Sequence, residues 1–462
     1  FRPGAALACI CIVADAGLGK SRLLHEFQKW TDTRRDSYQL LQGRATPQMQ
    51  RQPYGLLRDI LAWRLQIQDA DSMDVAKSKL ERFIVPLFIA DEGAEGAAAH
   101  AHLLGQMIGL DFSASRHVAG IAEDARQIRA RGFRTAALAF DSISALAAAP
   151  VMLMLEDLHW ADDASLDFVE YLVRTSSNVP MLILSSTRPT LFERRESIPA
   201  AAATRIQLAP LDAAMSDELA SELLQRVPRV PPALRTLLTK GAEGNPFYME
   251  ESVKMLIDSR ALVTAPEGWR VDAEKVMATQ IPGTLTGVLQ ARLDLLPGDE
   301  RQASQVCAVV GFTFWDKAVA FVEPGAERKL PPLAKRQLIS PKQRVDGGLI
   351  EDDALEYVFG HHLLHQVTYE TVIKSRRQKA HARAAEWFAR MTGARANDFI
   401  AIAAEHFEKA GELHRACEYF ALAAEHAART FANEMSLEFI ERGLKLATAG
   451  DDKVRWRLLA SR

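Results

Sequence analysis

One short loop constrains what this chain can fold into more than any other feature. Residues 14–21 read ADAGLGKS, directly after the apolar run of residues 7–13 and directly before the helix-patterned residues 22–27. A strand, a glycine-containing loop ending in Lys-Ser, and a helix are the layout of a phosphate-binding loop, whose backbone N–H groups cradle phosphate oxygens. The sequence therefore predicts an α/β domain that binds a nucleotide.

Two residues of this loop have expected roles in binding the nucleotide. Lys20 reaches the β/γ-phosphates and the Ser21 hydroxyl ligates Mg²⁺, so ATP or ADP with Mg²⁺ is the expected cofactor. Ala14 stands where the strict pattern has its first glycine; if that position needs a positive φ, alanine costs about 1–2 kcal/mol there. The residues expected to bind the nucleotide are Ala16, Gly17, Leu18, Gly19, Lys20, Ser21 and Arg22.

The same N-terminal residues allow a second interpretation. Arg2, the short apolar run and the small residues of positions 14–16 also resemble a secretory signal peptide with its cleavage site. That interpretation leaves residues 17–21 unexplained. Because the chain begins with Phe1 rather than Met, we expect it to start inside a longer protein.

Composition indicates a soluble multidomain protein. A chain of 462 residues is too long for one core and should hold about three or four domains. The net charge of −3 gives no global field that attracts nucleic acid or an anionic membrane. The four cysteines show no metal or disulfide spacing, which suits a reducing cytoplasm. The longest apolar stretches are shorter than the ~20 residues of a membrane helix, so no membrane association is expected.

The pattern of elements divides the chain. Up to about residue 210, short apolar runs alternate with helical segments such as residues 54–65 and 122–147, which predicts a parallel α/β sheet covered on both faces. The next stretch shows helices with no convincing strand. The expected strands are residues 7–13, 38–42, 151–155, 181–185 and 205–208.

The second half of the chain is expected to be mainly helical. Two short β-like pieces, residues 337–340 and 355–359, lie among helices and give the outline of a winged-helix domain. Farther on, small and large apolar residues recur as they do in helical-hairpin repeats, and another helix begins near Asn433. Such arrays usually need three or more units, so we expect the natural protein to continue beyond this end. The recurring residues are Ala404, Phe407, Gly411, Leu413, Ala416, Phe420 and Ala423.

Two further strand ends carry charged side chains. Glu156 and Asp157 follow residues 151–155; in a P-loop fold, one carboxylate here holds Mg²⁺ and the other polarises the attacking water. Glu156 fits the metal role and Asp157 the catalytic role. Arg188 follows another apolar run and could stabilise γ-phosphate charge, because parallel sheets gather their sites at the carboxyl ends of strands. Alternatively, the two acids only begin a helix, and the arginine only caps a strand at the surface.

With these residues in hand, the chain resembles the signal-transduction ATPases with numerous domains (STAND), a branch of the AAA-related P-loop ATPases. It is similar in particular to the ATPase modules of bacterial adenylyl or guanylyl cyclases and of maltose-activator-type regulators. The resemblance covers nearly the whole chain. Its motifs are residues 17–23, LEDLHWAD at 155–162, STRP at 186–189, EGNPFYMEE at 243–251, ARLDLLP at 291–297, and FGH at 359–361 followed by Tyr369-Glu370.

The resemblance implies a domain order and two more site residues. It implies a P-loop ATPase core over residues 1–210, a helical lid over 211–290, a winged-helix domain over 291–390 and repeats like tetratricopeptide repeats (TPR) over 391–462. Pro246 would lie near the adenine, and His361 would contact the β-phosphate in a closed, ADP-bound form.

Other interpretations of these residues stay open. Residues 244–246 could be a turn between helices, and His361, His362 and His365 could form a solvated helix face. The His361 and His365 spacing lacks the further ligand pattern of a zinc site. Two departures from the family bear on activity: Ala14 replaces a glycine, and Glu156 is one methylene longer than the usual Asp, which puts hydrolysis in more doubt than binding.

The expected function is an ATP-binding, slowly hydrolysing regulatory switch. An inducer or protein partner would act on the repeats, ATP could permit assembly into a homo-oligomer, and any output, such as a cyclase or a transcription regulator, would lie outside this chain. The alternatives are a scaffold without nucleotide binding, a DNA-binding regulator and a small-molecule kinase. For DNA binding, the one short basic cluster at residues 376–379 is weak evidence beside a net charge of −3. A kinase would not need the domains that follow the ATP site.

Overall fold

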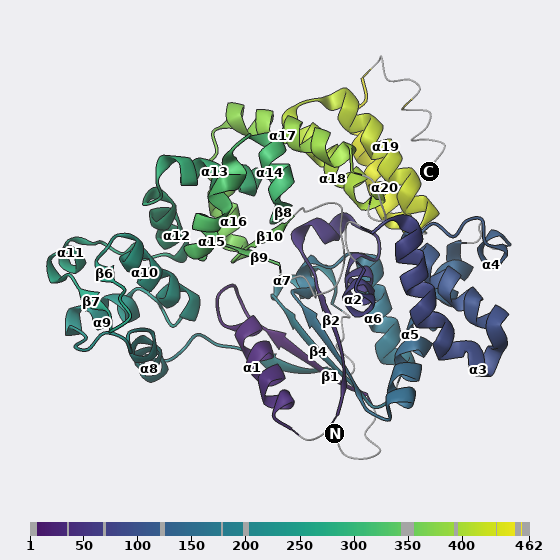
Figure 1. The fold of residues 1–462 in the computed structure, drawn as a ribbon, viewed down its shortest axis with the longest axis horizontal. Helices are drawn as coiled ribbons and strands as arrows, with labels where there is room; N and C mark the ends of the chain where they lie inside the picture. Colours follow the sequence, from purple (N-terminus) through teal and green to yellow (C-terminus); the bar gives the residue numbers. More distant parts are fainter. Residues whose placement is uncertain are drawn as a thin grey trace.

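The computed structural model shows a sheet domain followed by three mainly helical parts (Figure 1). In this view the sheet domain lies at the bottom, the helices after residue 211 lie at the left, and the second small sheet and the C-terminal helices lie above the sheet domain. The structure describes residues 7–34, 37–67, 71–120, 125–176, 179–196, 203–342, 355–391, 396–430, 432–448 and 454.

A five-stranded parallel sheet forms the core of the first part, in the order β2-β3-β4-β1-β5. All five strands expected from the sequence are present. The apolar run that could resemble a signal peptide is the strand β1, which lies inside the sheet between β4 and β5. The strands are β1 Ala8–Val13, β2 Gln39–Arg44, β3 Val151–Glu156, β4 Met181–Thr187 and β5 Ala203–Gln207.

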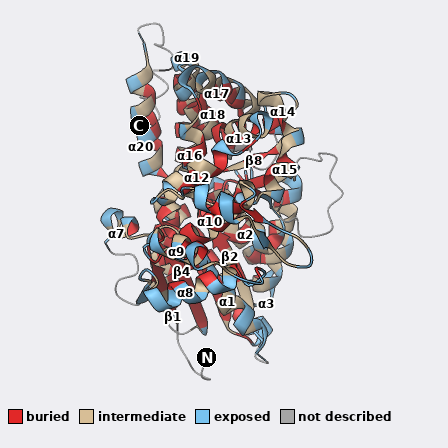
Figure 2. Cartoon of the chain, turned by 90° about the vertical axis from the view of Figure 1, so that its left-hand side faces the viewer, coloured by how far each residue is buried: buried red, intermediate tan, exposed pale blue. Residues whose placement is uncertain are grey.

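Helices cover both faces of this sheet. One face packs against α1 through residues such as Ile12, Leu24 and Met154, and the other contributes to a large apolar cluster with α2, α3, α5 and α6. Burial of both faces explains why the strands read as nearly continuous apolar runs (Figure 2). The helices are α1 Lys20–Asp32, η1 Pro47–Arg51, α2 Gly55–Leu65, α3 Met73–Met107, α4 Arg116–Ala119, α5 Ala125–Ala147, η2 Leu158–Trp160, α6 Asp163–Thr175 and α7 Thr190–Arg194.

The next part, residues 211–290 in the sequence-based division, is a small helical unit with its own apolar cluster. The expectation of a stretch without strands was wrong, because β6 and β7 form a two-stranded antiparallel hairpin. Strands of two residues are too short to show a sequence period. The elements are α8 Ala213–Leu223, α9 Pro232–Lys240, α10 Pro246–Asp258, β6 Leu262–Val263, β7 Arg270–Val271 and α11 Ala273–Ala278.

A second small sheet follows, in the antiparallel order β8-β10-β9. Two of its strands lie where the sequence indicated them, and β8 is an additional strand of three residues. The winged-helix domain expected over residues 291–390 stays a prediction. The elements are α12 Leu285–Asp294, α13 Gly298–Val310, β8 Thr313–Trp315, α14 Asp316–Val322, η3 Ala326–Lys329, α15 Leu330–Lys335, β9 Ile339–Pro341, β10 Glu356–Phe359 and α16 His362–Glu370.

Each C-terminal helix packs against the next one along the chain, and many of the side chains buried between these helices are alanine or phenylalanine. One apolar cluster extends from Leu289 to Ile440, so the division near residue 390 does not separate two cores. Within the described residues, no helix is long and apolar enough to span a bilayer. The helices are α17 Lys374–Ala389, α18 Ala396–Ala410, α19 Leu413–Arg429 and α20 Asn433–Leu446.

The segment after β2 connects the sheet domain to the rest of the molecule. Nε2 of Gln48 donates to the carbonyl oxygen of Thr313 at 3.3 Å, and Arg51 forms an ion pair with Glu405 on α18. A second carboxylate, Glu438 on α20, lies 3.9 Å from Nε of Arg51. The short helix η1 therefore contacts both the second sheet and the C-terminal helices.

Candidate functional site

The glycine-containing loop lies at the carboxyl end of β1 and leads directly into α1. Gly17 and Gly19 have φ values of 85° and 92°, in the region that favours glycine. Ala14 is not among the described residues with positive φ; it is fully buried, and its N–H donates to the carbonyl oxygen of Thr187 at 3.2 Å. The departure from the strict motif therefore causes no backbone strain of the kind considered from the sequence.

Lys20 is buried at the start of α1, beneath the loop. Its Nζ donates to the carbonyl oxygens of Ala14 at 2.8 Å and Asp15 at 2.9 Å. Burial lowers the pKa of Lys20, while the nearby charges of Asp157 and Asp15 act in the opposite direction. The ammonium group thus lies next to the loop amides, where it can meet an incoming phosphate.

The ends of β3 and β4 place opposite charges beside the loop. Asp157 has a φ of 56°, and its carboxylate lies 3.2 Å from Nη2 of Arg44 at the end of β2. The backbone N–H of Asp157 donates to Oγ of Ser186 at 3.2 Å. Burial lowers the pKa of the Arg188 guanidinium, and Asp157 partly offsets that effect. The parallel sheet therefore brings these charged groups to one edge, as the strand-end rule predicts.

Glu156 occupies a different position from its neighbour. It is the last residue of β3, it does not line the cavity described below, and its Oε2 is buried with no hydrogen-bond partner in the described part of the chain. A cation, directly or through its water, could satisfy that oxygen. Ser21 lines the cavity, and a hydroxyl and a carboxylate oxygen are ligand types that suit Mg²⁺, which usually keeps several waters. The described residues hold no cluster of three or more histidine, cysteine or carboxylate ligands.

The N-terminus of α10 contacts the loop from the opposite side. Asn245 caps this helix, because its Oδ1 accepts from the N–H groups of Phe247 and Tyr248 at 3.0 and 3.2 Å. Its Nδ2 donates to the carbonyl oxygen of Ala16 at 3.2 Å. A Cβ at Gly17 would lie 2.6 Å from Oδ1 of Asn245. The predicted turn is thus a helix cap that touches the phosphate-binding loop, with Pro246 as the first helical residue.

His361 approaches the cavity from the second sheet. It caps α16, its Nδ1 accepts from the N–H of Leu363 at 3.1 Å, and its ring stacks on Phe247 with 4.2 Å between centroids. Burial lowers the pKa of His361 to about 3, and the charge of Arg188 adds to the shift. With Nδ1 as an acceptor, the neutral ring carries its proton on Nε2 and can donate from there.

The neighbouring histidines are also turned inward. Burial lowers the pKa of His362 and His365 to about 4. Nε2 of His365 lies 2.9 Å from the carbonyl oxygen of Ala308, and the ring of His362 lies 4.7 Å from that of Trp160. The alternative of a solvated histidine face on this helix is therefore wrong.

These groups surround one cavity of about 1310 Å³. That volume exceeds the roughly 300–1,000 Å³ of most small-molecule sites, so it has room for a nucleotide with its water. All predicted site residues except Glu156 line it. The predicted residues on the wall are Ala16, Gly17, Leu18, Gly19, Lys20, Ser21, Arg22, Asp157, Arg188, Pro246 and His361.

Residues 2–184 match the family model described as the AAA ATPase domain. This part of the chain is therefore similar to AAA ATPase domains. The match includes the phosphate-binding loop and the Glu156-Asp157 pair and ends within β4, before Arg188. An AAA ATPase domain binds a nucleotide, usually with Mg²⁺, and supports ATPase activity in general.

Comparison with known proteins identified relatives of greater length. An uncharacterized protein of Rhizobium meliloti (strain 1021) is 24% identical over 453 residues, which cover 95% of this chain and 40% of that protein. The chain thus spans about two fifths of the length of this curated relative.

Among solved structures, a STAND protein with a tetratricopeptide-repeat sensor from Pyrococcus horikoshii aligns with 99% of this chain and 65% of its own, with 11% identity and a TM-score of 0.43. The Aeropyrum pernix Orc1 protein, in complex with DNA, aligns with 80% of this chain and 87% of its own, with 10% identity and a TM-score of 0.30.

The structure adds residues to the AAA site that the sequence analysis missed. Arg44 lines the cavity and pairs with Asp157. The strand-end rule that indicated Arg188 could also have indicated Arg44, because it ends β2 in the same parallel sheet. Phe247 lines the cavity as well, but no sequence signal predicted its contact with His361.

Asp162, the last residue of the distinctive LEDLHWAD segment, has an architectural role. Asp162 caps α6 and also accepts from the N–H groups of Tyr54 and Gly55 at 2.9 and 3.0 Å. It is nearly fully buried and holds the start of α2 against α6. By contrast, Trp160 lies on the cavity wall. Tyr369, which belongs to the last of the family's motifs, is outside that wall and contacts His381 instead.

Proposed function

We propose that this chain is the nucleotide-dependent switch of a STAND-type signalling protein. It would bind ATP or ADP with Mg²⁺, hydrolyse ATP slowly and control an attached or partner output domain, such as a nucleotide cyclase or a transcription regulator. The observation that carries the proposal is a cavity lined by the phosphate-binding loop, the first turn of α10 and the cap of α16. A nucleotide there would touch three parts of the chain at once.

The sheet side of the cavity supplies the binding and hydrolytic groups in this proposal. Loop amides and Lys20 hold the phosphates, and Arg188 stabilises charge on the γ-phosphate. Ser21 and Glu156 would hold Mg²⁺, which neutralises phosphate charge when bound. Asp157 orients the attacking water and accepts its proton. Its ion pair with Arg44 would have to rearrange to make room for that water.

The opposite side supplies the control in this proposal. His361 would donate from Nε2 to a phosphate of ADP while Pro246 packs near the base, which keeps the three parts closed. ATP and an inducer or partner on the C-terminal helices would favour an open form, which could assemble into a homo-oligomer. The nucleotide and the inducer or partner would then both shift the same equilibrium between the closed and open forms, as coupling between sites requires.

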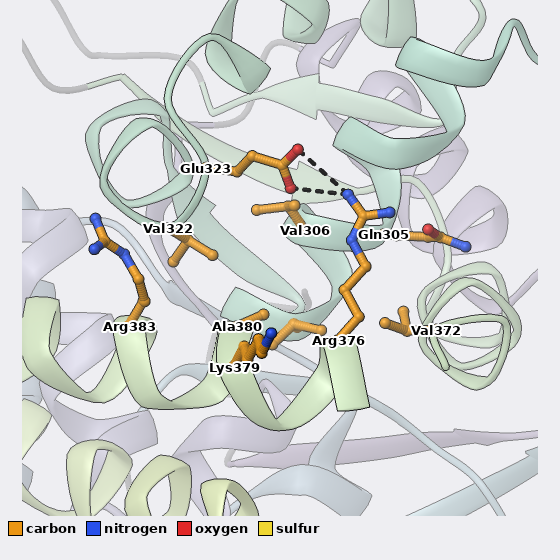
Figure 3. Close-up of a pocket in the computed structure, with 10 residues that line it drawn as sticks. Gln305, Val306, Val322, Glu323, Val372, Arg376, Lys379, Ala380 and Arg383 are labelled. Atoms are coloured by element: carbon orange, nitrogen blue, oxygen red, sulfur yellow. Dashed lines mark hydrogen bonds and ion pairs between the residues drawn. The ribbon is translucent and has the colours of Figure 1, made fainter. Parts of the chain in front are cut away.

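The alternative of DNA binding through the basic cluster has less support. Arg376 is paired with Glu323 at 2.9 Å, as Figure 3 shows. Arg377 donates to the carbonyl oxygen of Val372 at 2.7 Å and lies over the ring of Tyr369. Side chains already committed to these partners are poor candidates for phosphate contacts.

The alternative of a scaffold that binds no nucleotide also loses its main argument. That argument was Ala14, whose backbone shows no positive φ.

A calorimetric titration tests the proposal. ADP and a non-hydrolysable ATP analogue, each with Mg²⁺, should bind the wild-type protein, and Lys20→Ala should weaken both by about 10- to 100-fold, the size of a charge-assisted contact. Lys29→Ala, an exposed lysine on the same helix, is the control and should bind normally. No binding in either protein would contradict the proposal and favour the scaffold. Equal affinities in wild type and Lys20→Ala would contradict the assignment of this loop as the phosphate site.

A further inference from the structure

Phe247 belongs to one part of the molecule and packs in another. It lies in the first turn of α10, yet its side chain packs against the apolar cluster that contains Phe312 and Phe359 of the second sheet region. It is partly buried and lines the nucleotide cavity. The residue therefore connects α10 with the region of the second sheet.

Its backbone and its ring make contacts on two different sides. The N–H of Phe247 points toward the carbonyl oxygen of Gly17 at 3.3 Å, as well as to Oδ1 of its cap residue, Asn245. Its ring stacks on that of His361, with 4.2 Å between centroids and 30° between planes. One residue thus links the phosphate-binding loop to His361.

Two contacts orient the ring of His361. Its Nδ1 already accepts from the N–H of Leu363, so the proton of the neutral ring is on Nε2. That hydrogen bond selects the tautomer, and the flat face of Phe247 restricts the plane of the ring. Together the two contacts determine which atom donates and in which direction.

We propose that Phe247 is a positioning residue that holds the imidazole of His361 toward the phosphates and so makes the closed form selective for ADP. This inference rests on the proposed function, in which His361 contacts the nucleotide. A branched aliphatic side chain could fill the same apolar space, but it would not offer a flat face. The proposal therefore predicts that ring shape at position 247 matters in addition to apolar volume.

Matched substitutions separate these two properties. Phe247→Leu keeps an apolar side chain and removes the ring, whereas Phe247→Tyr keeps the ring. Phe247→Leu should raise the Kd for ADP by about 5-fold, the size of an aromatic pair contact, with a smaller change for a non-hydrolysable ATP analogue. Phe247→Tyr should bind ADP with wild-type affinity. Thermal unfolding without nucleotide should be similar for both variants.

A double-mutant cycle with His361→Ala provides the decisive measurement. If Phe247 acts through His361, Phe247→Leu should add no further loss of ADP affinity in the His361→Ala background. Additive losses, or equal losses for ADP and the ATP analogue, would overturn the inference. If His361→Ala binds ADP like wild type while Lys20→Ala does not, the proposed site stands but the roles of both His361 and Phe247 are wrong. If Lys20→Ala also binds normally, the proposed function itself fails.

Discussion

The two walls of the nucleotide cavity are built in different ways. On one wall, the loop after β1 and the residues after β3 and β4 are held in register by one parallel sheet with buried faces. On the other wall, Pro246 and Phe247 lie in the first turn of α10, and His361 caps α16. The start of α10 meets the loop through a few hydrogen bonds, and Phe247 meets His361 through one ring contact.

In the proposed function, this difference would separate hydrolysis from control of the switch. A sheet edge positions charges rigidly, as phosphate binding and hydrolysis require. Contacts across a cavity between separate parts can be lost with little disturbance to either part, as a switch requires. Variants of the sheet wall should therefore change turnover or affect all nucleotides alike, whereas variants of the opposite wall should change shape and the preference for ADP.

The largest expected effect is on hydrolysis, at Asp157. Removing a group that orients and deprotonates water should slow single-turnover phosphate release by about 100- to 10,000-fold, with little change in nucleotide affinity. Asn is a suitable replacement because it tolerates the positive φ of this position as Asp does. We expect Asp157→Asn to behave in this way.

Glu156→Gln provides the contrast. It should weaken Mg²⁺-dependent binding as well as turnover, because a metal ligand serves the ground state and the transition state alike. If Asp157→Asn loses affinity while the rate constant is unchanged, the two roles are reversed or wrong.

A pair of glycines tests the contact between the walls. Gly17→Ala and Gly19→Ala both place a Cβ at positive φ, at a cost of about 1–2 kcal/mol, so both should weaken nucleotide binding by a similar factor. Only the Cβ at Gly17 would meet Asn245; in the described part of the chain, the one at Gly19 would point into open space. Gly17→Ala alone should also expand the particle in small-angle scattering with ADP. Equal radii of gyration for the two variants would show that the loop does not hold the lid.

Acid should open the cavity. Burial depresses the pKa of His361 to about 3 and that of His362 to about 4 from an ordinary value near 6.5. In the proposed opening, both rings would become exposed and regain that ordinary value. The closed form therefore releases protons. The part of its stability that depends on the neutral histidines is fully present above about pH 6.5 and is lost as the pH falls below it. Arg188, Lys20 and Arg44 act in the same direction at His361.

Scattering without nucleotide can measure this opening. At pH 5.5 the closing equilibrium should weaken by up to about tenfold for each histidine whose pKa is fully depressed. A His361→Asn/His362→Asn variant, which cannot titrate at these positions, should lose most of the response. An unchanged pH response in that variant would assign the effect to other groups.

The smallest expected effect is at the contact between the sheet domain and the C-terminal helices. Arg51→Ala removes the ion pairs with Glu405 and Glu438, which are partly exposed and therefore worth about 0–1 kcal/mol. Limited proteolysis should cleave Arg51→Ala slightly faster than wild type between the sheet domain and the C-terminal helices, and the ADP affinity should be unchanged. Arg415→Ala, whose ion pairs lie with Glu386 and Glu412, is the control. A large loss of nucleotide binding in Arg51→Ala would show that this contact supports the site directly.

The sequence by itself determined the five strands of the parallel sheet, the phosphate-binding loop, the charged residues that follow β3 and β4, and the helical character of the rest. These features depend on contiguous residues: apolar runs of strand length, glycines that adopt positive φ, and a Lys-Ser pair at a helix start. Local spacing encodes such features because the backbone geometry of strands, turns and helix starts repeats from protein to protein.

Only the tertiary structure decided which distant side chains meet. Arg44 pairs with Asp157, Asn245 reaches the loop at Ala16, and Phe247 stacks on His361. The partners in each pair are separated by more than a hundred residues, and their contact depends on how whole elements pack. The strands β6, β7 and β8 follow the same rule, because two or three residues are too few to show a period and become strands only when a neighbouring segment pairs with them.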